Sequence, residues 1–163
     1  VEQDLRANQR GGQQAGKSWQ HSALGLTVPI PDGWELKQFR GTTILGLPPA
    51  KPGQFAMNVN VTVSPQGALR DMEHLQKANL RQLNRMKLEV DRFELELRDG
   101  VQIVSGGYHG RLGRQRPLRF LVLGVLRKKQ KIYVTATATP EQWATHENLL
   151  RELMAGIRLT KPR

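Results

Sequence analysis

Apolar and polar residues alternate at several places along the chain, and each alternation predicts a β-strand. The clearest case is residues 57–63, where Met and Val side chains alternate with Asn and Thr. A period of two is typical of a strand with one apolar and one polar face. Similar or largely apolar runs bounded by turn residues predict further strands over 24–30, 42–47, 88–97, 101–109, 118–126 and 132–139.

Two other segments have helical spacing. Between about residues 67 and 86 apolar side chains recur mostly at three-residue steps, which predicts an amphipathic helix. A second helix is predicted after Thr139, because Pro140 suits the first helical position and Gln142 completes a capping box with that threonine. Trp143 starts the apolar face of this helix, and we interpret it and Trp34 as core anchors.

The run 118–126 is apolar at both parities, so this strand is expected to be buried on both faces of its sheet. Arg98-Asp99-Gly100 is a hairpin signal, and residues 127–131 have the length of a second hairpin loop. These elements predict an α+β fold. It has a mainly antiparallel β-sheet flanked by helices, an α/β/α sandwich.

The start of the chain has a different composition. Residues 1–21 are polar and glycine-rich without a sustained apolar period, which predicts a flexible basic N-terminal arm or linker. Residues 22–163 are expected to form a single domain. Because the chain does not begin with Met, we expect that an export signal or anchor was removed upstream.

Composition excludes several classes of protein. The 163 residues are 38% apolar and 24% charged, as in an ordinary globular domain. The longest apolar run, 120–126, is far shorter than the ~20 residues of a membrane-spanning helix. Cysteine is absent, so disulfides and thiol catalysis are excluded.

Candidate catalytic chemistry is sparse. None of the four histidines pairs with another at metal-ligand spacing, and no serine lies in a Gly-x-Ser-x-Gly motif. Ser105-Gly106-Gly107 falls in a predicted strand, where paired glycines mark a bulge or a close backbone approach. Glu94 and Glu96 share a strand face and are interpreted as solvated or ion-paired. We therefore expect no enzyme activity, no catalytic residue, no metal and no cofactor.

The order of motifs is similar to a known family. Leu-Thr-Val-Pro-Ile-Pro-Asp-Gly-Trp (26–34) is followed by an Asn-Val-Asn-Val-Thr-Val strand (58–63), a long helix, meandering strands and a closing helix over 143–159. This pattern resembles the PsbP-like superfamily, which includes PsbP, DcrB-like, LpqN-type lipoproteins and Ran-binding Mog-type proteins. The resemblance implies a scaffold used mostly for binding, with no family-wide catalytic residue to carry over. Its members include envelope lipoproteins and chaperones of type VI secretion effectors.

Basic residues are the remaining signal, because 25 Lys and Arg against 14 Asp and Glu give a net charge of +11. They gather on the two sides of the 118–126 strand, which separates them by about 25–30 Å. The candidate partner-binding residues are Arg111, Arg114, Arg116 and Arg119 before or at the start of this strand, and Arg127, Lys128, Lys129 and Lys131 after it.

Three functions follow as hypotheses. The first is a non-enzymatic PsbP/DcrB-like binding domain that engages a protein partner in the cell envelope or periplasm, provided that a signal was removed; otherwise it is cytoplasmic. The second is an intracellular chaperone or adaptor for a type VI secretion effector, which predicts a concave apolar surface and a dimer. The third is an electrostatic binder of nucleic acid or anionic membrane through the basic loops.

Overall fold

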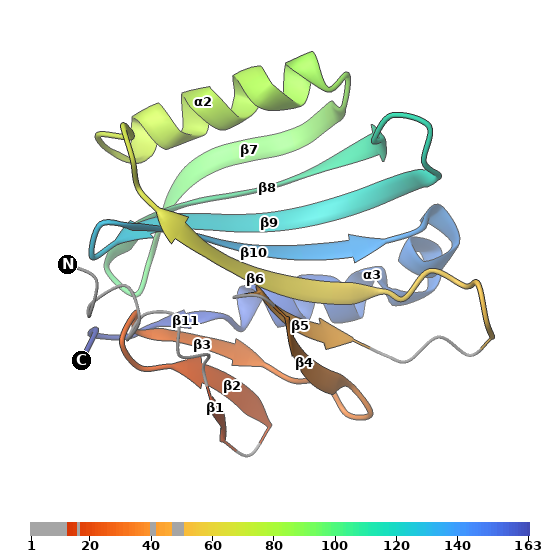
Figure 1. The fold of residues 1–163 in the computed structure, drawn as a ribbon, viewed down its shortest axis with the longest axis horizontal. Helices are drawn as coiled ribbons and strands as arrows, with labels where there is room; N and C mark the ends of the chain where they lie inside the picture. The colour runs from red at the N-terminus through yellow and green to blue at the C-terminus, as the bar shows by residue number, and fades with distance from the viewer. Residues whose placement is uncertain (1–12, 16, 40–41, 47–50) are drawn as a thin grey trace.

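The structure, a computed structural model, describes residues 13–15, 17–39, 42–46 and 51–163. It is an α+β fold built mainly from antiparallel sheet, as the sequence predicts (Figure 1). In spatial order, the larger sheet contains β4 (Glu35–Phe39), β5 (Thr42–Gly46), β6 (Asn58–Pro65), β10 (Gln130–Ala138), β9 (Pro117–Arg127), β8 (Val101–Arg111) and β7 (Glu89–Arg98).

A smaller antiparallel sheet lies below the larger one in Figure 1. Its strands, in spatial order, are β1 (Gln13–Ala15), β2 (Ser18–His21), β3 (Leu26–Pro29) and β11 (Arg158–Leu159). The strand β11 joins the chain's last helix to this sheet, because Leu159 pairs with Leu26 of β3.

Helices α2 (Met72–Arg85) and α3 (Pro140–Ala155) lie on opposite faces of the larger sheet. Helix α2 packs over β7 and β8, whereas α3 packs over β9, β10 and β3 (Figure 1). The interior strand β9 is buried from both sides: Val122 lies in the cluster under α2, and Leu121 and Leu123 lie in the cluster under α3. The predicted α/β/α sandwich is therefore confirmed.

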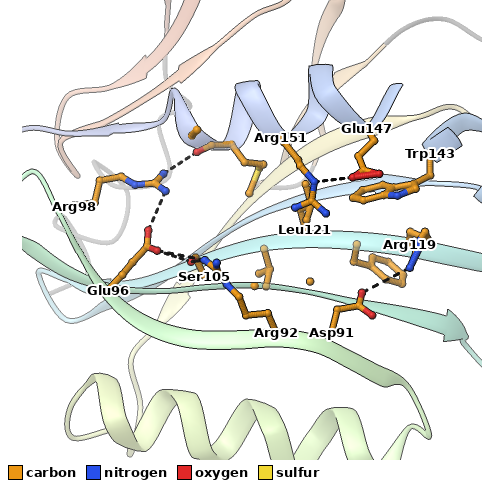
Figure 2. Close-up of a pocket in the computed structure, with 16 residues that line it drawn as sticks. Asp91, Arg92, Glu96, Arg98, Ser105, Arg119, Leu121, Trp143, Glu147 and Arg151 are labelled. Atoms are coloured by element: carbon orange, nitrogen blue, oxygen red, sulfur yellow. Dashed lines mark hydrogen bonds and ion pairs between the residues drawn. The ribbon is translucent and has the colours of Figure 1, made fainter. Parts of the chain in front are cut away.

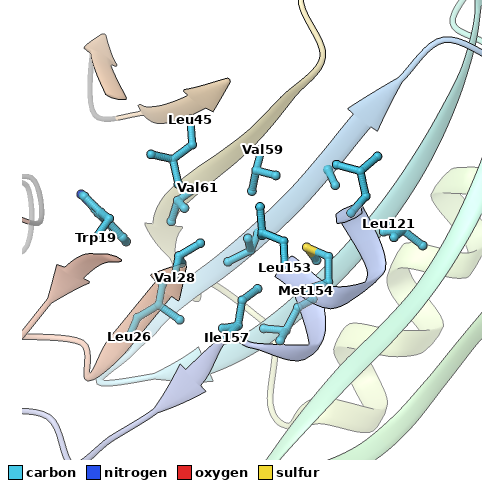
Figure 3. Close-up of a cluster of buried hydrophobic side chains, with 14 of the residues drawn as sticks. Trp19, Leu26, Val28, Leu45, Val59, Val61, Leu121, Leu153, Met154 and Ile157 are labelled. Carbon is cyan, nitrogen blue, oxygen red and sulfur yellow. The ribbon is translucent and has the colours of Figure 1, made fainter. Parts of the chain in front are cut away.

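The main core fills the space between α3, the small sheet and the larger sheet. Figure 3 shows Leu26 and Val28 of β3 and Val59 and Val61 of β6, which belong to this one cluster. From the other side, α3 and the residue after its cap contribute Leu153, Met154 and Ile157. Trp34 and Trp143 are both buried in this cluster, which confirms them as core residues.

Local signals explain where the helices begin. Thr139 caps α3: its side chain accepts from the Gln142 backbone, and the Gln142 side chain accepts from the Thr139 N–H, so the predicted capping box is confirmed. Helix α2 begins at Met72, five residues later than predicted, because Asp71 is its N-cap and accepts from the His74 N–H at 2.8 Å. Both predicted hairpins form, with Asp99-Gly100 and Lys128-Lys129 at positive φ in their turns.

Several elements differ from the sequence-based expectation. Residues 18–21, predicted to belong to an arm, form β2 and place Trp19 in the core at 1% exposure. The folded part thus includes these residues, while 1–12 lie outside the described residues and their prediction as an arm stays a prediction. The strand β4 was not predicted, and residues 158–159 pair with β3 as β11 instead of continuing the closing helix.

Replacing Trp19 tests the corrected boundary of the domain. We expect Trp19→Ala to lower the free energy of unfolding by about 3–5 kcal/mol, because it removes a large buried ring from a close-packed cluster. The neighbouring Gln20 is exposed, so Gln20→Ala is the matched control, with an expected change within about 0.5 kcal/mol. Urea denaturation followed by circular dichroism measures both. A neutral Trp19→Ala would show that residues 18–21 contribute nothing to folding.

Tyr108 of β8 packs against a second buried cluster, on the α2 side of the sheet, which includes Met72, Leu75 and Val122. Its ring stacks on that of Phe120, with centroids 4.7 Å apart. Burial, with a smaller contribution from the nearby Tyr133, raises the pKa of Tyr108 to about 12. The fold therefore favours the neutral phenol, whereas the same group in the unfolded chain ionises at about pH 10.

This difference makes stability pH-dependent in the alkaline range. The contribution of Tyr108 is fully present below about pH 10 and is lost as the pH rises toward about 12. Tyr108→Phe keeps the stacked ring and removes the titrating group, so its unfolding midpoint in urea should fall less than that of the wild type between these two pH values. Parallel falls for the two proteins would contradict the assignment.

Candidate functional site

A groove of about 430 Å³ lies where α3 runs alongside the uncovered part of β7 and β8 (Figure 2). One wall is α3, the floor is the middle of β8 and β9, and the outer rim is β7. We call it the charged groove, and the residues that line it are Asp91, Arg92, Glu96, Arg98, Ser105, Gly106, Gly107, Arg119, Phe120, Leu121, Val122, Trp143, Glu147, Arg151, Met154 and Ala155.

Two glycines shape the floor. A Cβ at Gly106 would collide with the carbonyl of Arg92 and lie 2.8 Å from the Cα of Phe93, so β7 and β8 approach here as only glycine allows. The register of this pair shifts between Val90 and Arg92, which leaves Asp91 as the extra residue of a bulge. The expectation that the paired glycines mark a bulge or a close backbone approach is confirmed.

Trp143 forms the α3 wall of the charged groove. The guanidinium carbons of Arg119 and Arg151 each lie 5.3 Å from the centroids of its ring, in the range of cation–π contacts. Arg151 also donates from Nε to Glu147 at 2.9 Å, one turn earlier on the helix. Trp143 therefore combines a buried core contact with two arginines at the groove, one from β9 and one from α3.

Glu96 organises the opposite end of the charged groove. It accepts from Arg98 at 3.0 Å and from the Ser105 hydroxyl at 2.9 Å, and Arg92 lies 3.6 Å away. Arg98 in turn donates to the carbonyl of Met154 at 2.7 Å, in the last turn of α3. This places a cation where a helix dipole favours one and where α3 has no basic residue of its own.

Asp91, the bulge residue of β7, contacts side chains of β8 and β9. Its carboxylate lies 3.0 Å from Nδ1 of His109 and 3.9 Å from Arg119. His109 also contacts Glu89 through Nε2 at 2.9 Å. Glu94, on the same strand face as Glu96, lies 3.5 Å from Arg92, so the interpretation of these two carboxylates as solvated or ion-paired is confirmed.

The groove carries both signs of charge on partly exposed side chains. Such exposed pairs contribute only about 0–1 kcal/mol each, because water and salt screen them. A bound molecule that supplies its own charges can therefore replace them at little cost. Ser105 donates to a carboxylate already held by two arginines, which is the geometry of an ion-pair network rather than of an activated nucleophile.

The predicted partner-binding residues are placed differently from one another. Arg119 lines the charged groove, and Arg116 lies 6.0 Å from the ring of Phe55. Lys131 lies 5.8 Å from the ring of Tyr133, and Lys128 donates to the Arg163 carbonyl. The remaining members, Arg111, Arg114 and Lys129, lie in or beside the loops at the two ends of β9.

Arg127 has a role inside the fold. Its Nη1 lies 2.7–2.9 Å from the carbonyl oxygens of Leu24, Gly25 and Thr160, which ties the end of β9 to the small sheet and the segment after β11. Burial lowers the pKa of this guanidinium from its ordinary value. These contacts explain an arginine at this position without a partner.

Most residues of the groove escaped the sequence analysis, including Arg92, Arg98 and Arg151. They come from three segments that only the fold brings together. A usable signal was present in β7, where Arg92, Glu94, Glu96 and Arg98 alternate with apolar residues opposite the paired glycines.

Comparison with known proteins places the fold. No protein-family model and no curated protein matches this chain. Among solved structures, cyanobacterial PsbP (CyanoP) of Synechocystis sp. PCC 6803 has a TM-score of 0.59 at 15% identity, over 91% of this chain and 98% of that chain. The fold is PsbP-like.

Two further structures share the PsbP-like fold. LpqN of Mycobacterium tuberculosis, described as involved in cell envelope biogenesis, has a TM-score of 0.57 at 14% identity over 83% of each chain. The Ran-binding protein Mog1p of Saccharomyces cerevisiae has a TM-score of 0.56 at 9% identity, over 83% of this chain and 90% of that chain. At these identities the likeness shows the fold alone.

Two further observations on the described residues concern metal binding and membrane-spanning helices. No group of three His, Cys, Asp or Glu side chains among them could hold a metal ion. Neither of their helices has the length and apolarity needed to cross a membrane.

Replacing Arg127 tests its structural role. We expect Arg127→Met to lower the free energy of unfolding by about 1.5–3 kcal/mol, because three carbonyls lose a charged donor. The adjacent Lys128→Met removes the same charge from an exposed side chain and should change stability by less than about 0.5 kcal/mol. Thermal denaturation compares the two variants. Equal, small effects would return Arg127 to the candidate binding residues.

Proposed function

We propose that this protein is a non-enzymatic binding domain whose charged groove holds a segment of a protein partner. The observation that carries the proposal is Trp143 flanked by Arg119 and Arg151 at the wall of an open groove. Tryptophan and arginine are the residue types most enriched where protein interfaces concentrate their binding energy. The envelope or periplasm is the compartment we propose, which LpqN, with the same fold, supports.

The arrangement of charge indicates what the partner segment carries. Four arginines and three carboxylates line the groove, so the site is mixed in sign with a positive excess. A segment with acidic side chains and an apolar residue between them would pair with the arginines and cover Trp143 and Met154. Electrostatic complementarity of this kind gives specificity and speeds association.

The alternative functions have less support. An effector chaperone predicts a concave apolar surface, whereas the exposed large apolar side chains of the described residues are Met86 and Leu97. A nucleic-acid or membrane binder predicts one continuous basic surface, whereas the two basic groups lie at opposite ends of β9, and Arg127 is held inside the fold.

A capture experiment with two charge-matched variants tests the proposal. The wild type is immobilised and exposed to a nuclease-treated extract of the native organism, and retained proteins are quantified by mass spectrometry. Arg119→Gln/Arg151→Gln removes two charges from the charged groove. Arg81→Gln/Arg85→Gln removes two exposed charges from α2, on the other face of the sheet.

We expect one protein to be retained by the wild type and the α2 variant and to be reduced about tenfold or more with the groove variant, the loss that corresponds to about 1.4 kcal/mol. Equal retention by both variants would place the interface elsewhere. Retention of lipid alone, lost equally with both variants and at high salt, would show that net charge is what binds.

A further inference from the structure

A second cleft lies on the opposite face of the sheet, beneath the C-terminal half of α2. It measures about 220 Å³, and we call it the neutral cleft. Its lining residues are Thr62, Asn79, Gln82, Leu83, Met86, Phe93, Tyr108, Val122, Tyr133 and Thr135. None of these described residues carries a charge, in a chain in which 24% of the residues are charged.

The polar groups of the neutral cleft are held in place. The Tyr133 hydroxyl lies 2.8 Å from the Asn79 Nδ2, which donates to it, and 3.0 Å from Oδ1, which accepts from it. Burial raises the pKa of Tyr133 above its ordinary value, although the hydrogen bond with Asn79 acts in the opposite direction. The phenol is therefore neutral at physiological pH. The cleft therefore offers amide and hydroxyl groups that both donate and accept.

Aromatic rings form the apolar part of the neutral cleft. A Cβ at Gly124 would lie 2.9 Å from the Cε1 of Tyr133, so glycine at this position of β9 lets the ring lie close against the strand. The ring of Tyr108 is held in place by its stack on Phe120. The rings are positioned by the sheet before any ligand arrives, which reduces the entropy that binding must overcome.

In one direction the uncharged surface continues outward from the cleft, whereas Lys131 lies beyond Tyr133 in the other direction along β10. Thr62 of β6 pairs with Tyr133 of β10, and the next pair on the same face is Asn60 with Thr135. Helix α2 packs over β7 and β8 and leaves this side of the sheet uncovered. Amide and hydroxyl side chains thus extend along two adjacent strands, so a ligand longer than the cleft finds the same chemistry beyond it.

These features select the class of ligand. A charged ligand would lose hydration without meeting an opposite charge among the lining residues, and a wholly apolar one would leave the amide and hydroxyl groups without partners. The Nζ of Lys131 lies 5.8 Å from the centroid of the Tyr133 ring, where it already makes a cation–π contact. We propose that the neutral cleft binds one residue of an uncharged saccharide, whose apolar ring face rests on the tyrosines while its hydroxyls pair with Asn79, Gln82 and Thr62. The site is separate from the charged groove and does not depend on the function proposed for it.

Nuclear magnetic resonance titration of the 15N-labelled protein tests this inference. The probes are maltotriose, cellotriose and N,N′,N″-triacetylchitotriose, with hexanol as the apolar comparison. We expect at least one trisaccharide to shift the amide signals of Thr62, Asn79 and Tyr133 saturably, and hexanol to compete poorly. No saturable shift from any of the three, or a response to hexanol alone, would overturn the proposal.

Two variants connect the shifts to the side chains. Asn79→Ala should weaken the binding about tenfold, because a hydrogen bond to the saccharide and the anchor of Tyr133 are both lost. Asn84→Ala is the matched control, since it is an exposed asparagine on the same helix. Tyr133→Phe is the second variant, needed in case Asn79→Ala disturbs the fold. It keeps the ring, removes the hydroxyl and should also weaken the binding. Unchanged affinity in both Asn79→Ala and Tyr133→Phe would contradict the assignment.

Discussion

The width of the larger sheet is the constraint on which the rest of the structure depends. Seven strands spaced about 4.8 Å apart span about 29 Å, whereas a helix with its side chains is about 10 Å wide. One helix per face therefore covers only part of the sheet. Helix α2 takes β7 and β8 on one face, and α3 with the small sheet takes β4 to β6, β10 and β9 on the other. Among the described residues, each face keeps an uncovered part, and the two uncovered parts lie at opposite sides of the sheet.

The sequence gives these two uncovered parts opposite chemistry. On the α3 face, β7 places Arg92, Glu96 and Arg98 beside the helix. Glu96 pairs with both arginines along the strand, and Arg98 also donates across to the Met154 carbonyl of α3. On the α2 face, β6 and β10 place Thr62 and Thr135 beside the helix instead. Strand alternation explains how one sheet carries both surfaces, because neighbouring positions of each strand face different layers. A charged groove and a neutral cleft then arise from the same incomplete coverage.

Much of the architecture could be predicted because it depends on local patterns. The capping box at Thr139, the Asp99-Gly100 turn and the doubly apolar β9 each act over a few residues, and each was interpreted correctly. The small sheet could not be predicted in this way. Its strands are only two to four residues long, and Trp19 lies beside a polar, glycine-rich stretch that hides a single buried ring. The charged groove could not be predicted either, since residues 91, 119 and 151 meet only after the strands and α3 have packed.

The basic composition also has to be reconsidered in terms of these contacts. A net charge of +11 suggested surfaces for an acidic partner, yet several cations have positions that the fold itself explains. Arg127 binds three carbonyls, Arg98 supplies a cation to the end of α3, and Arg119 lies over Trp143. Guanidinium groups suit this use because several donors in one plane reach carbonyls, carboxylates and ring faces at once. Part of the positive charge therefore stabilises the junctions between layers, and these contacts explain several cations without a partner.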